Sequence, residues 1–387
     1  MSEVKTCELG DLIEFQRGYD LPKSEFRNGP YPVQSSNGIL GYHIDYKVEG
    51  PGITIGRSGT VGIPHYLNEN FYPHNTTLFV KDFKGNDRKY IYYLLKHLKL
   101  NDFKTGSGVP TMNRNHLHPL KVNAFIDKNY QVKLSSILSI LDQKIALNNQ
   151  INEELEAMAK TLYDYWFVQF DFPDENGKPY KSSGGKMVYN DQLKREIPEG
   201  WGVEKLENIA NITMGQSPKG TSYNEVGEGM LFFQGSTDFG WRFPVARQYT
   251  TEPSRIAEED DILLSVRAPV GTLNIADTRC CIGRGLAAIN SKVGANSYIF
   301  NVMQDFKKLF DMMNSVGTTF GSITKDDLYS LKLIYPPNEL LMKFDKSVNS
   351  FDREIKNRSR QNQELTQLRD WLLPMLMNGQ ARVEDKT

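Results

Sequence analysis

Apolar residues recur between positions 134 and 166 at alternating intervals of four and three. This spacing is the heptad pattern of a coiled coil, in which one stripe of a helix faces a partner helix. It predicts a long helix over roughly residues 131–167, about 55 Å long at 1.5 Å per residue. Asn148 and Asn152 interrupt the stripe at its middle. The predicted seam positions of this helix are Leu134, Leu138, Leu141, Ile145, Asn152, Leu155 and Leu162.

The same pattern returns between residues 344 and 376. It predicts a second helix over roughly residues 339–373, which should end before Pro374 because proline lacks the amide hydrogen that a helix needs. We expect the two helices to pair antiparallel within one chain. Polar seam residues such as Arg358 weaken the pair but penalise slipped registers. The predicted seam positions of this helix are Phe344, Val348, Phe351, Ile355, Asn362, Leu365 and Leu372.

The residues upstream of the two helices also match one another. TGSGVPTMNRNHLHPLKV at 105–122 parallels VGTTFGSITKDDLYSLKL at 316–333. With one gap, ITIGRSGTVG at 53–62 parallels ILLSVRAPVG at 262–271. Short alternating runs such as GITIG predict strands, and KYIYYLLKHL at 89–98 predicts a helix. One unit is therefore a mixed module followed by a long helix, and this unit occurs twice.

These patterns predict the α+β class, with two similar mixed modules separated by two long antiparallel helices that form an intramolecular coiled coil. The segment DFPDENGKPYKSSGG at 171–185 is rich in Gly, Pro, Ser and charge, which is typical of a linker. The expected boundaries are 1–130 for the first module, 131–168 for the central helix, 169–199 for the linker, 200–337 for the second module, 338–378 for the C-terminal helix and 379–387 for a tail.

The composition and motifs narrow the function. A net charge of −1 means that any nucleic-acid site must be a local patch. No apolar run approaches the ~18 residues of a membrane span, and three cysteines without a secretion pattern indicate a cytoplasmic protein. We find no phosphate-binding loop, no paired-cysteine motif and no catalytic constellation. His116 and His118 have no third ligand nearby to complete a zinc site. The chain is therefore expected to bind rather than to catalyse, without a metal or cofactor of its own.

The duplicated architecture resembles the DNA specificity subunit of Type I restriction–modification enzymes. LDQKI at 141–145 and FDREI at 351–355, in the two predicted helices, carry the resemblance together with LYDYWFVQFDFP at 162–173 and GQSPKGTSYNEVGEGMLFFQGSTDF at 215–239. The family often has Pro-Pro-x-x-Glu-Gln before each helix, whereas this chain has YPPNELLMKF before the second helix only.

The resemblance implies two target-recognition domains, each of which reads one half of a split double-stranded DNA sequence. It implies that the paired helices set the spacing of the half-sites and dock two methylation subunits, and that restriction subunits complete the complex. The chain would then be no enzyme. S-adenosylmethionine, ATP and Mg would belong to the partner subunits, and no membrane would be involved.

DNA bases and phosphates are contacted by cationic, amide and hydroxyl side chains, so the polar turns between apolar runs hold the candidates. We expect them at matching places in the two copies. In the first module they are Arg17, Lys23, Gln34, Ser36, Asn37, Arg57, Ser58, His74, Asn75, Lys104, Ser107 and Arg114. In the second module they are Gln216, Lys219, Ser222, Tyr223, Gln234, Ser236, Arg242, Arg267, Arg284, Thr318, Thr319 and Lys325.

Several alternatives stay open at this stage. The heptads could pair two copies of the chain, although intramolecular pairing gains effective concentration. The chain could be a coiled-coil adaptor without DNA specificity, or a self-contained enzyme, against which the missing motifs count. Individual candidates also have structural readings, since an arginine in a turn is often a surface ion-pair partner and His74 or Tyr223 could simply support the core.

Overall fold

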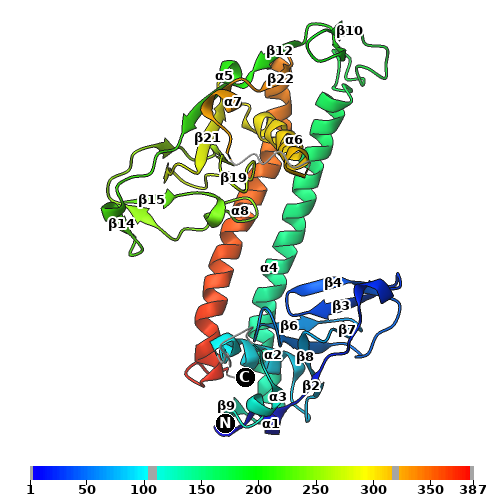
Figure 1. The fold of residues 1–387 in the computed structure, drawn as a ribbon, viewed down its shortest axis with the longest axis vertical. Helices are drawn as coiled ribbons and strands as arrows, with labels where there is room; N and C mark the ends of the chain where they lie inside the picture. The colour runs from blue at the N-terminus through cyan, green and yellow to red at the C-terminus, as the bar shows by residue number, and fades with distance from the viewer. Residues whose placement is uncertain (1–2, 103–110, 316–321, 384–387) are drawn as a thin grey trace. The chain divides into compact units, whose positions relative to one another are not determined.

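The computed structural model describes residues 3–102, 111–315 and 322–383. It divides into two compact units, and both are drawn in Figure 1. Unit 1 comprises residues 1–147 and 361–387, and unit 2 comprises residues 148–360. Each unit contains one mixed module and a stretch of each of two long helices, α4 (Lys128–Tyr163) and α8 (Asn338–Met377).

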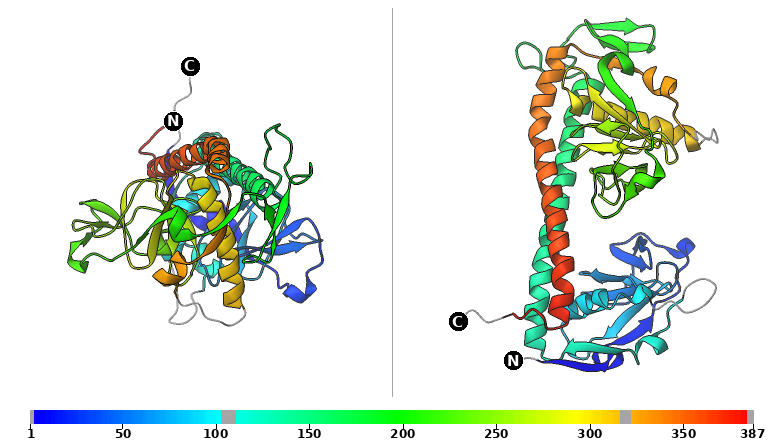
Figure 2. Two further views of the ribbon diagram at one scale, coloured as in Figure 1. Left: turned by 90° about the horizontal axis from the view of Figure 1, so that it is seen from above. Right: turned by 90° about the vertical axis from the view of Figure 1, so that its left-hand side faces the viewer.

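Within each unit the two long helices run antiparallel and side by side (Figures 1 and 2). In unit 1, Arg369 of α8 contacts Asp142 of α4. In unit 2, Arg358 donates to Asn148, and Phe344 packs against Trp166 in the π-helical turn that follows α4 (Asp164–Val168). None of the fourteen predicted seam positions is exposed. The predicted pair of long intrachain helices is confirmed.

The prediction that the second helix ends before Pro374 is wrong. Helix α8 continues through Pro374 to Met377. Leu376 and Met377 are fully or almost fully buried in the core of unit 1, which also contains Leu134 and Leu138 of α4. A proline inside a helix destabilises it by about 3 kcal/mol. Burial of a large apolar side chain stabilises the fold by about 1.5–3 kcal/mol, so the two buried side chains together offset the effect of the proline. Tertiary packing therefore extends the helix beyond its local stop signal.

The module of unit 1 is built from three small sheets. The first is fully antiparallel, in the order β2-β8-β5-β6; the second has the order β4-β3-β7, with β3 and β7 parallel; the third pairs β1 with β9. Its strands are β1 (Val4–Glu8), β2 (Glu14–Arg17), β3 (Tyr31–Ser35), β4 (Gly38–His43), β5 (Gly52–Gly56), β6 (Pro64–Leu67), β7 (Tyr72–Pro73), β8 (Thr77–Asp82) and β9 (Lys121–Phe125). Its helices are α1 (Leu9–Leu12), η1 (Lys23–Glu25), α2 (Arg88–His97), η2 (Leu100–Asp102) and α3 (Arg114–Leu117).

The module of unit 2 keeps this topology and enlarges the second sheet to five strands, in the order β14-β16-β15-β20-β17. The sheet β13-β21-β18-β19 has the order and directions of β2-β8-β5-β6, β15 and β20 are parallel like β3 and β7, and β12 pairs with β22 as β1 pairs with β9. Its strands are β12 (Gly202–Lys205), β13 (Ala210–Met214), β14 (Tyr223–Asn224), β15 (Met230–Phe233), β16 (Tyr249–Thr250), β17 (Ile256–Ala257), β18 (Ile262–Ser265), β19 (Leu273–Ile275), β20 (Cys280–Ile282), β21 (Leu286–Ser291) and β22 (Lys332–Tyr335). Its helices are α5 (Leu206–Ile209), η4 (Gly220–Ser222), η5 (Ser236–Asp238), α6 (Asn296–Ser315) and α7 (Lys325–Tyr329).

The segment expected to be a linker is folded. It contains the hairpin β10 (Met187–Asn190) and β11 (Arg195–Pro198), and Asp171 accepts hydrogen bonds from the backbone and hydroxyl of Ser182. Phe172 stacks on Tyr180 and on Trp201, with ring centroids 4.6 and 5.1 Å apart. The aromatic residues give this Gly- and Ser-rich stretch enough apolar surface to pack against the core of its own unit.

The four-stranded sheet of each module buries one face against helices of its own unit. In unit 1, strand residues such as Ile53 and Leu78 pack with α2 and with Leu134 of α4; in unit 2, Ile262 and Ile289 pack with α6 and with Phe344 of α8. The modules are thereby fixed to their stretches of the long helices. No helix within the described ranges is both long and apolar enough to cross a bilayer.

Candidate nucleic-acid interface

Three arginines predicted from separate stretches of sequence meet around one recess in the module of unit 1. The recess has a volume of about 490 Å³. Arg17 comes from the end of β2, Arg57 from the turn after β5, and Arg114 from the start of α3. The remaining lining residues are Gln16, Gly18, Leu78, Asn113 and Asn115, so the lining holds no carboxylate.

Main-chain hydrogen bonds hold these three elements together. The amide of Arg57 donates to the carbonyl of Thr76, and the amide of Met112 donates to the carbonyl of Arg57, both at 2.8 Å. Gly18 is required where β2 ends, because a Cβ there would lie 2.1 Å from the carbonyl oxygen of His74. The positions of the arginine backbones are thus set by contacts that are distant in sequence.

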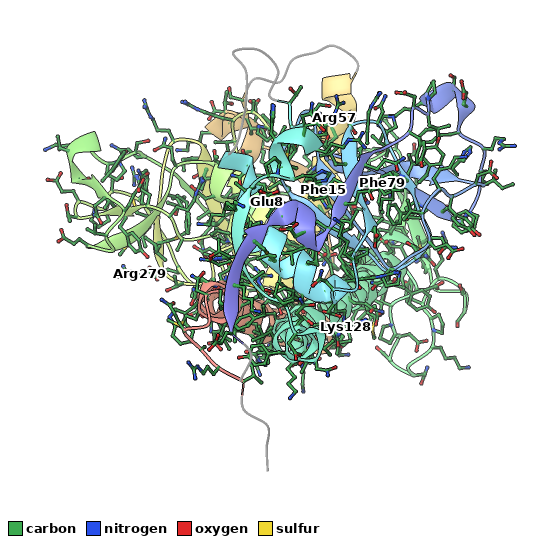
Figure 3. All side chains as sticks on the ribbon, turned by 90° about the horizontal axis from the view of Figure 1, so that it is seen from below. Glu8, Phe15, Arg57, Phe79, Lys128 and Arg279 are labelled. Atoms are coloured by element: carbon green, nitrogen blue, oxygen red, sulfur yellow. The ribbon has the colours of Figure 1, made fainter. Side chains whose placement is uncertain are left out.

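The guanidinium groups in the recess differ in their partners. Arg17 donates to Asp20 at 3.1 Å, and Asp20 also accepts a hydrogen bond from Asn75. Among the residues that the structure describes, no ion pair or hydrogen bond engages the guanidinium group of Arg57 or of Arg114. In the view of Figure 3, Arg57 lies on the side of the module away from Lys128, with Phe15 and Phe79 between them. Two uncompensated cations at one recess make a local site for an anion.

Two predicted DNA-binding residues of the segment QSSNG at 34–38, Gln34 and Ser36, are buried and serve the fold. Gln34 and Ser36 are 3% and 5% exposed, and the Gln34 amide donates to the carbonyl of Ser35 at 2.9 Å. They are therefore not placed to read a base edge, which corrects the prediction for both; Asn37 beside them is exposed. The sequence could not reveal this because burial depends on how β3 packs against β7.

The other candidates of the first module are scattered. Lys23 is exposed in η1. Ser58 is half-buried in a bridge to Thr111, and His74 shares a 3.2 Å hydrogen bond with Thr76. Lys104 and Ser107 lie outside the described residues.

Equivalent hydrogen bonds align the two modules residue by residue. The amide of Gly18 donates to the carbonyl of Thr77, and in the second module the amide of Gly215 donates to the carbonyl of Leu286. Likewise, the amide of Met112 donates to the carbonyl of Arg57, and the amide of Ile323 donates to the carbonyl of Val266. Val266 therefore occupies the position of Arg57, and by the same register Met214 and Lys325 occupy those of Arg17 and Arg114. The arginine recess is not repeated in the second module.

Arg267 is not the counterpart of Arg57. Arg267 forms a bridge with Ser322 as Ser58 does with Thr111, so it corresponds to Ser58. In a strand, a shift of one residue turns the side chain to the other face. Arg267 is exposed, whereas Val266 points into the core.

The second module instead gathers polar groups beside Gly215. Ser217 and Gln234 are joined by hydrogen bonds of 3.1 and 2.9 Å, and the backbone amide of Arg284 donates to the Ser217 hydroxyl at 3.3 Å. The side chains of Gln216, Gln234 and Arg284 are exposed. This cluster lies where the first module has Asp20 and Asn75, so the two modules present different chemistry on one scaffold.

The remaining candidates of the second module have mixed surroundings. Lys219 is exposed, with its ammonium 3.9 Å from Glu252, and Lys325 lies 5.0 Å from the ring centre of Tyr329. Ser222 is buried and bonded to Thr250, and Tyr223 donates to the carbonyl of Pro218. Ser236 is half-buried at the start of η5. Thr318 and Thr319 lie outside the described residues.

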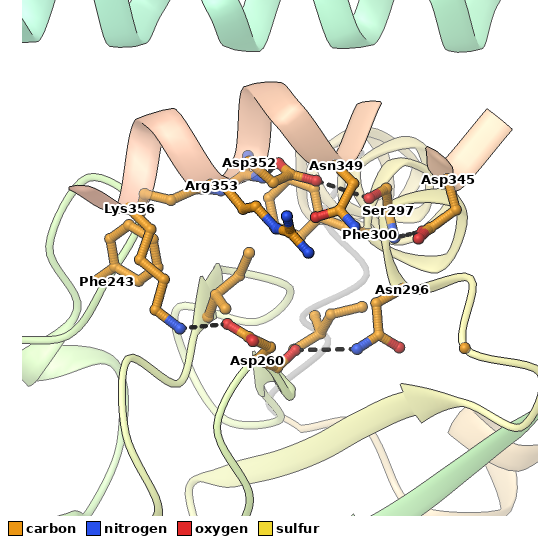
Figure 4. A pocket seen from close by; sticks show the side chains of 14 residues that line it. Phe243, Asp260, Asn296, Ser297, Phe300, Asp345, Asn349, Asp352, Arg353 and Lys356 are labelled. Atoms are coloured by element: carbon orange, nitrogen blue, oxygen red, sulfur yellow. Dashed lines mark hydrogen bonds and ion pairs between the residues drawn. The ribbon is translucent and has the colours of Figure 1, made fainter. Parts of the chain in front are cut away.

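Arg242 has a structural role instead of the predicted DNA contact. It is 6% exposed and forms ion pairs with Glu156 of α4 at 3.0 Å and with Asp352 of α8 at 2.6 Å. Its guanidinium lies 4.0 Å from the ring centre of Phe300. Figure 4 shows the surrounding pocket, where the Ser297 hydroxyl also donates to Asp352. Because both carboxylates sit on the long helices, this arginine fastens the second module to them.

Residues missed from the sequence complete the recess of the first module. Gln16, Asn113 and Asn115 line it beside the arginines. The run NRN around Arg114 was a usable signal, since amide and guanidinium groups in one turn are typical of nucleic-acid contacts. No group of three or more His, Cys, Asp or Glu side chains in the described part of the chain is arranged to hold a metal ion.

Comparisons with known proteins agree on one family. A family model described as "Type I restriction modification DNA specificity domain" matches residues 1–157 and 198–367. The "Putative type I restriction enzyme MjaX specificity subunit" of Methanocaldococcus jannaschii is 33% identical over 304 residues, which is 76% of this chain and 68% of the relative. The "Type I restriction enzyme MjaIX specificity subunit" of the same organism is 27% identical over 77% of this chain and 70% of its own.

One solved structure has the same fold over the full chain. The S subunit of a Type I restriction-modification system from M. genitalium superposes with a TM-score of 0.66, at 18% sequence identity, and covers 100% of this chain and 97% of its own.

Proposed function

Because the chain belongs to the family of Type I restriction modification DNA specificity domains, with one match over each module, we propose that it is the sequence-specific DNA-binding subunit of a Type I restriction–modification complex. Each module reads one half of a split double-stranded DNA target. The chain acts without catalysis of its own, and we expect it in the cytoplasm together with the DNA that it binds.

The duplicated topology with unlike polar surfaces is the observation that carries this proposal. The two modules share sheet order and hydrogen-bond register, so both can approach DNA in a similar way. Yet Arg57 is replaced by Val266, and Asp20 by Ser217. Discrimination between base pairs depends on which donors and acceptors meet the base edges. Two copies of one scaffold with different polar groups are suited to two different half-sites.

We propose that the long helices dock two methylation subunits. In unit 1, large apolar side chains are exposed on both helices: Ile140 at 63% and Leu147 at 49% on α4, and Leu368 at 43% and Trp371 at 57% on α8. Exposed apolar groups gathered on one element are typical of protein interfaces. S-adenosylmethionine would then be supplied by the methylation subunits, and ATP and Mg by the restriction subunits. The double variant Ile140→Ser, Trp371→Ser should lose co-purification with the methylation subunit while the chain stays folded.

Selection from random duplex DNA, using the chain together with its methylation subunits, tests the main proposal. Enrichment of one split motif supports it. No enrichment would favour the coiled-coil adaptor without DNA specificity. Arg267→Ala should relax or abolish recognition of one half of the motif only. The matched control is Arg279→Ala, an exposed arginine of the same module that pairs with Glu258 at 3.0 Å, and it should leave the motif unchanged.

The paired helices should also fix the unread spacer between the half-sites. Major-groove faces recur about every 34–36 Å along DNA, and two packed helices resist bending. Adding one helical turn to both α4 and α8 should change the spacer and leave both half-sequences as they were. An unchanged spacer would contradict this part of the proposal.

A further inference from the structure

The recess of the first module combines three features that single it out from the rest of the described surface. Three guanidinium groups converge on it from β2, the β5–β6 turn and α3. Two of them, on Arg57 and Arg114, have no side-chain partner among the described residues. The lining contains three amide side chains and no carboxylate. We propose that this recess is a phosphate clamp that holds one backbone phosphate of the DNA, and that only the first module possesses it.

The geometry favours a phosphate over a base edge. A guanine edge is planar and is read by a single arginine through two parallel hydrogen bonds. A phosphate carries several oxygens that point in different directions, so it can accept from donors on several elements at once. Arg57, Arg114 and Asn113 approach the recess from two elements that are distant in sequence. Convergence of this kind suits a compact anion.

The second module lacks the arginines that form the clamp in the first module. At the equivalent positions the second module has Met214, Val266 and Lys325, and Val266 is buried in the core. The shared fold therefore does not require arginines at these places. The proposal rests on the proposed function, because it assumes that the chain binds DNA. It adds that the first module makes a phosphate contact that the second module lacks at the equivalent positions.

Salt dependence of DNA binding tests the clamp. Each phosphate contact that is lost should make the slope of log K against log salt less steep by about one. We expect this change for the double variant Arg57→Gln, Arg114→Gln, measured on the full chain with its methylation subunits and the selected split motif. With a slope less steep by about one, the loss of affinity relative to the wild type should shrink about fourfold between 50 and 200 mM salt. The selected motif should stay the same.

DNA in which single phosphates are uncharged provides a second test of the clamp. Phosphates near the first half-site are replaced one at a time by uncharged methylphosphonates. One position should weaken the wild type and have no further effect on the double variant. The control Lys325→Gln removes the cation at the position equivalent to Arg114 in the second module, and it should leave the effect of that methylphosphonate intact.

The outcomes separate this inference from the proposed function. If the wild type selects no split motif, the proposed function fails. If the wild type selects a motif and the double variant keeps the wild-type salt slope, only the clamp is refuted. Loss of preference at a single base position in the double variant would also refute it, since that result marks a base contact. Circular dichroism melting should show unchanged folding, because neither guanidinium makes a hydrogen bond or an ion pair with a described residue.

Discussion

Arg242 ties the second module to both long helices, and its removal should destabilise unit 2. Replacement by Met keeps much of the side-chain volume and removes the charge. It leaves Glu156 and Asp352 without their cation, although their side chains are only 29% and 26% exposed. Each carboxylate keeps one weaker partner, Gln304 for Glu156 and Ser297 for Asp352.

Removing one partner of a buried ion pair costs about 3–5 kcal/mol. Water reaches the two carboxylates in part, so we expect Arg242→Met to lower the free energy of unfolding of unit 2 by about 2–4 kcal/mol. Urea unfolding followed by tryptophan fluorescence is the assay. Three of the four tryptophans, Trp166, Trp201 and Trp241, lie in unit 2, so the signal reports mainly on that unit.

Two further variants make the result interpretable. Arg279→Met removes an exposed pair with Glu258 in the same module and should change the free energy of unfolding by less than about 1 kcal/mol. Adding Asp352→Asn to Arg242→Met should recover part of the loss, because it removes one uncompensated charge. A loss below about 1 kcal/mol for Arg242→Met, or a loss equal to that of Arg279→Met, would refute the reasoning that this pair is desolvated.

Three other changes should act on single units. Burial lowers the pKa of His65, His97 and His118. The unfolded chain takes up protons near the ordinary histidine pKa of about 6.5, whereas the folded chain takes them up only at a lower pH. Unit 1 should therefore lose stability as the pH falls below about 6.5. Unit 2 contains no histidine and should not show this loss. The variant His118→Gln keeps an acceptor for the Phe15 amide and should make the stability of unit 1 depend less on pH, as measured by hydrogen exchange. An unchanged pH profile would contradict this prediction. Asn152→Leu removes a buried Oδ1 that has no hydrogen-bond partner among the described atoms. The free energy of unfolding, measured in urea, should therefore rise by about 1 kcal/mol. A decrease would mean that the Asn152 side chain is fully hydrogen-bonded in the folded chain. Pro374→Ala restores a helical amide and should stabilise unit 1 by about 2 kcal/mol, measured by hydrogen exchange of the amides of unit 1. No gain would indicate that the helix is already relaxed at Pro374.

The long helices and the duplication follow from the sequence because both are recorded in local periodicity. A heptad seam depends on residues three and four apart, which meet on one helix face whatever the rest of the chain does. The repeat was visible because strands and helices of the two modules keep their order. The prolongation of α8 beyond Pro374 was not visible, because it depends on the core of unit 1 that receives Leu376 and Met377.

The candidate interface depended on tertiary structure to a larger extent. Residue type alone suggested Arg17, Arg57 and Arg114, but their convergence requires the hydrogen bond from Met112 to Arg57, which joins residues far apart in sequence. Residue type also suggested Arg242 and Gln34, and both proved to be buried. The sequence records which groups can bind DNA, since that is a property of each side chain. Which of them face solvent is decided only when distant strands pack and every buried charge must find a partner.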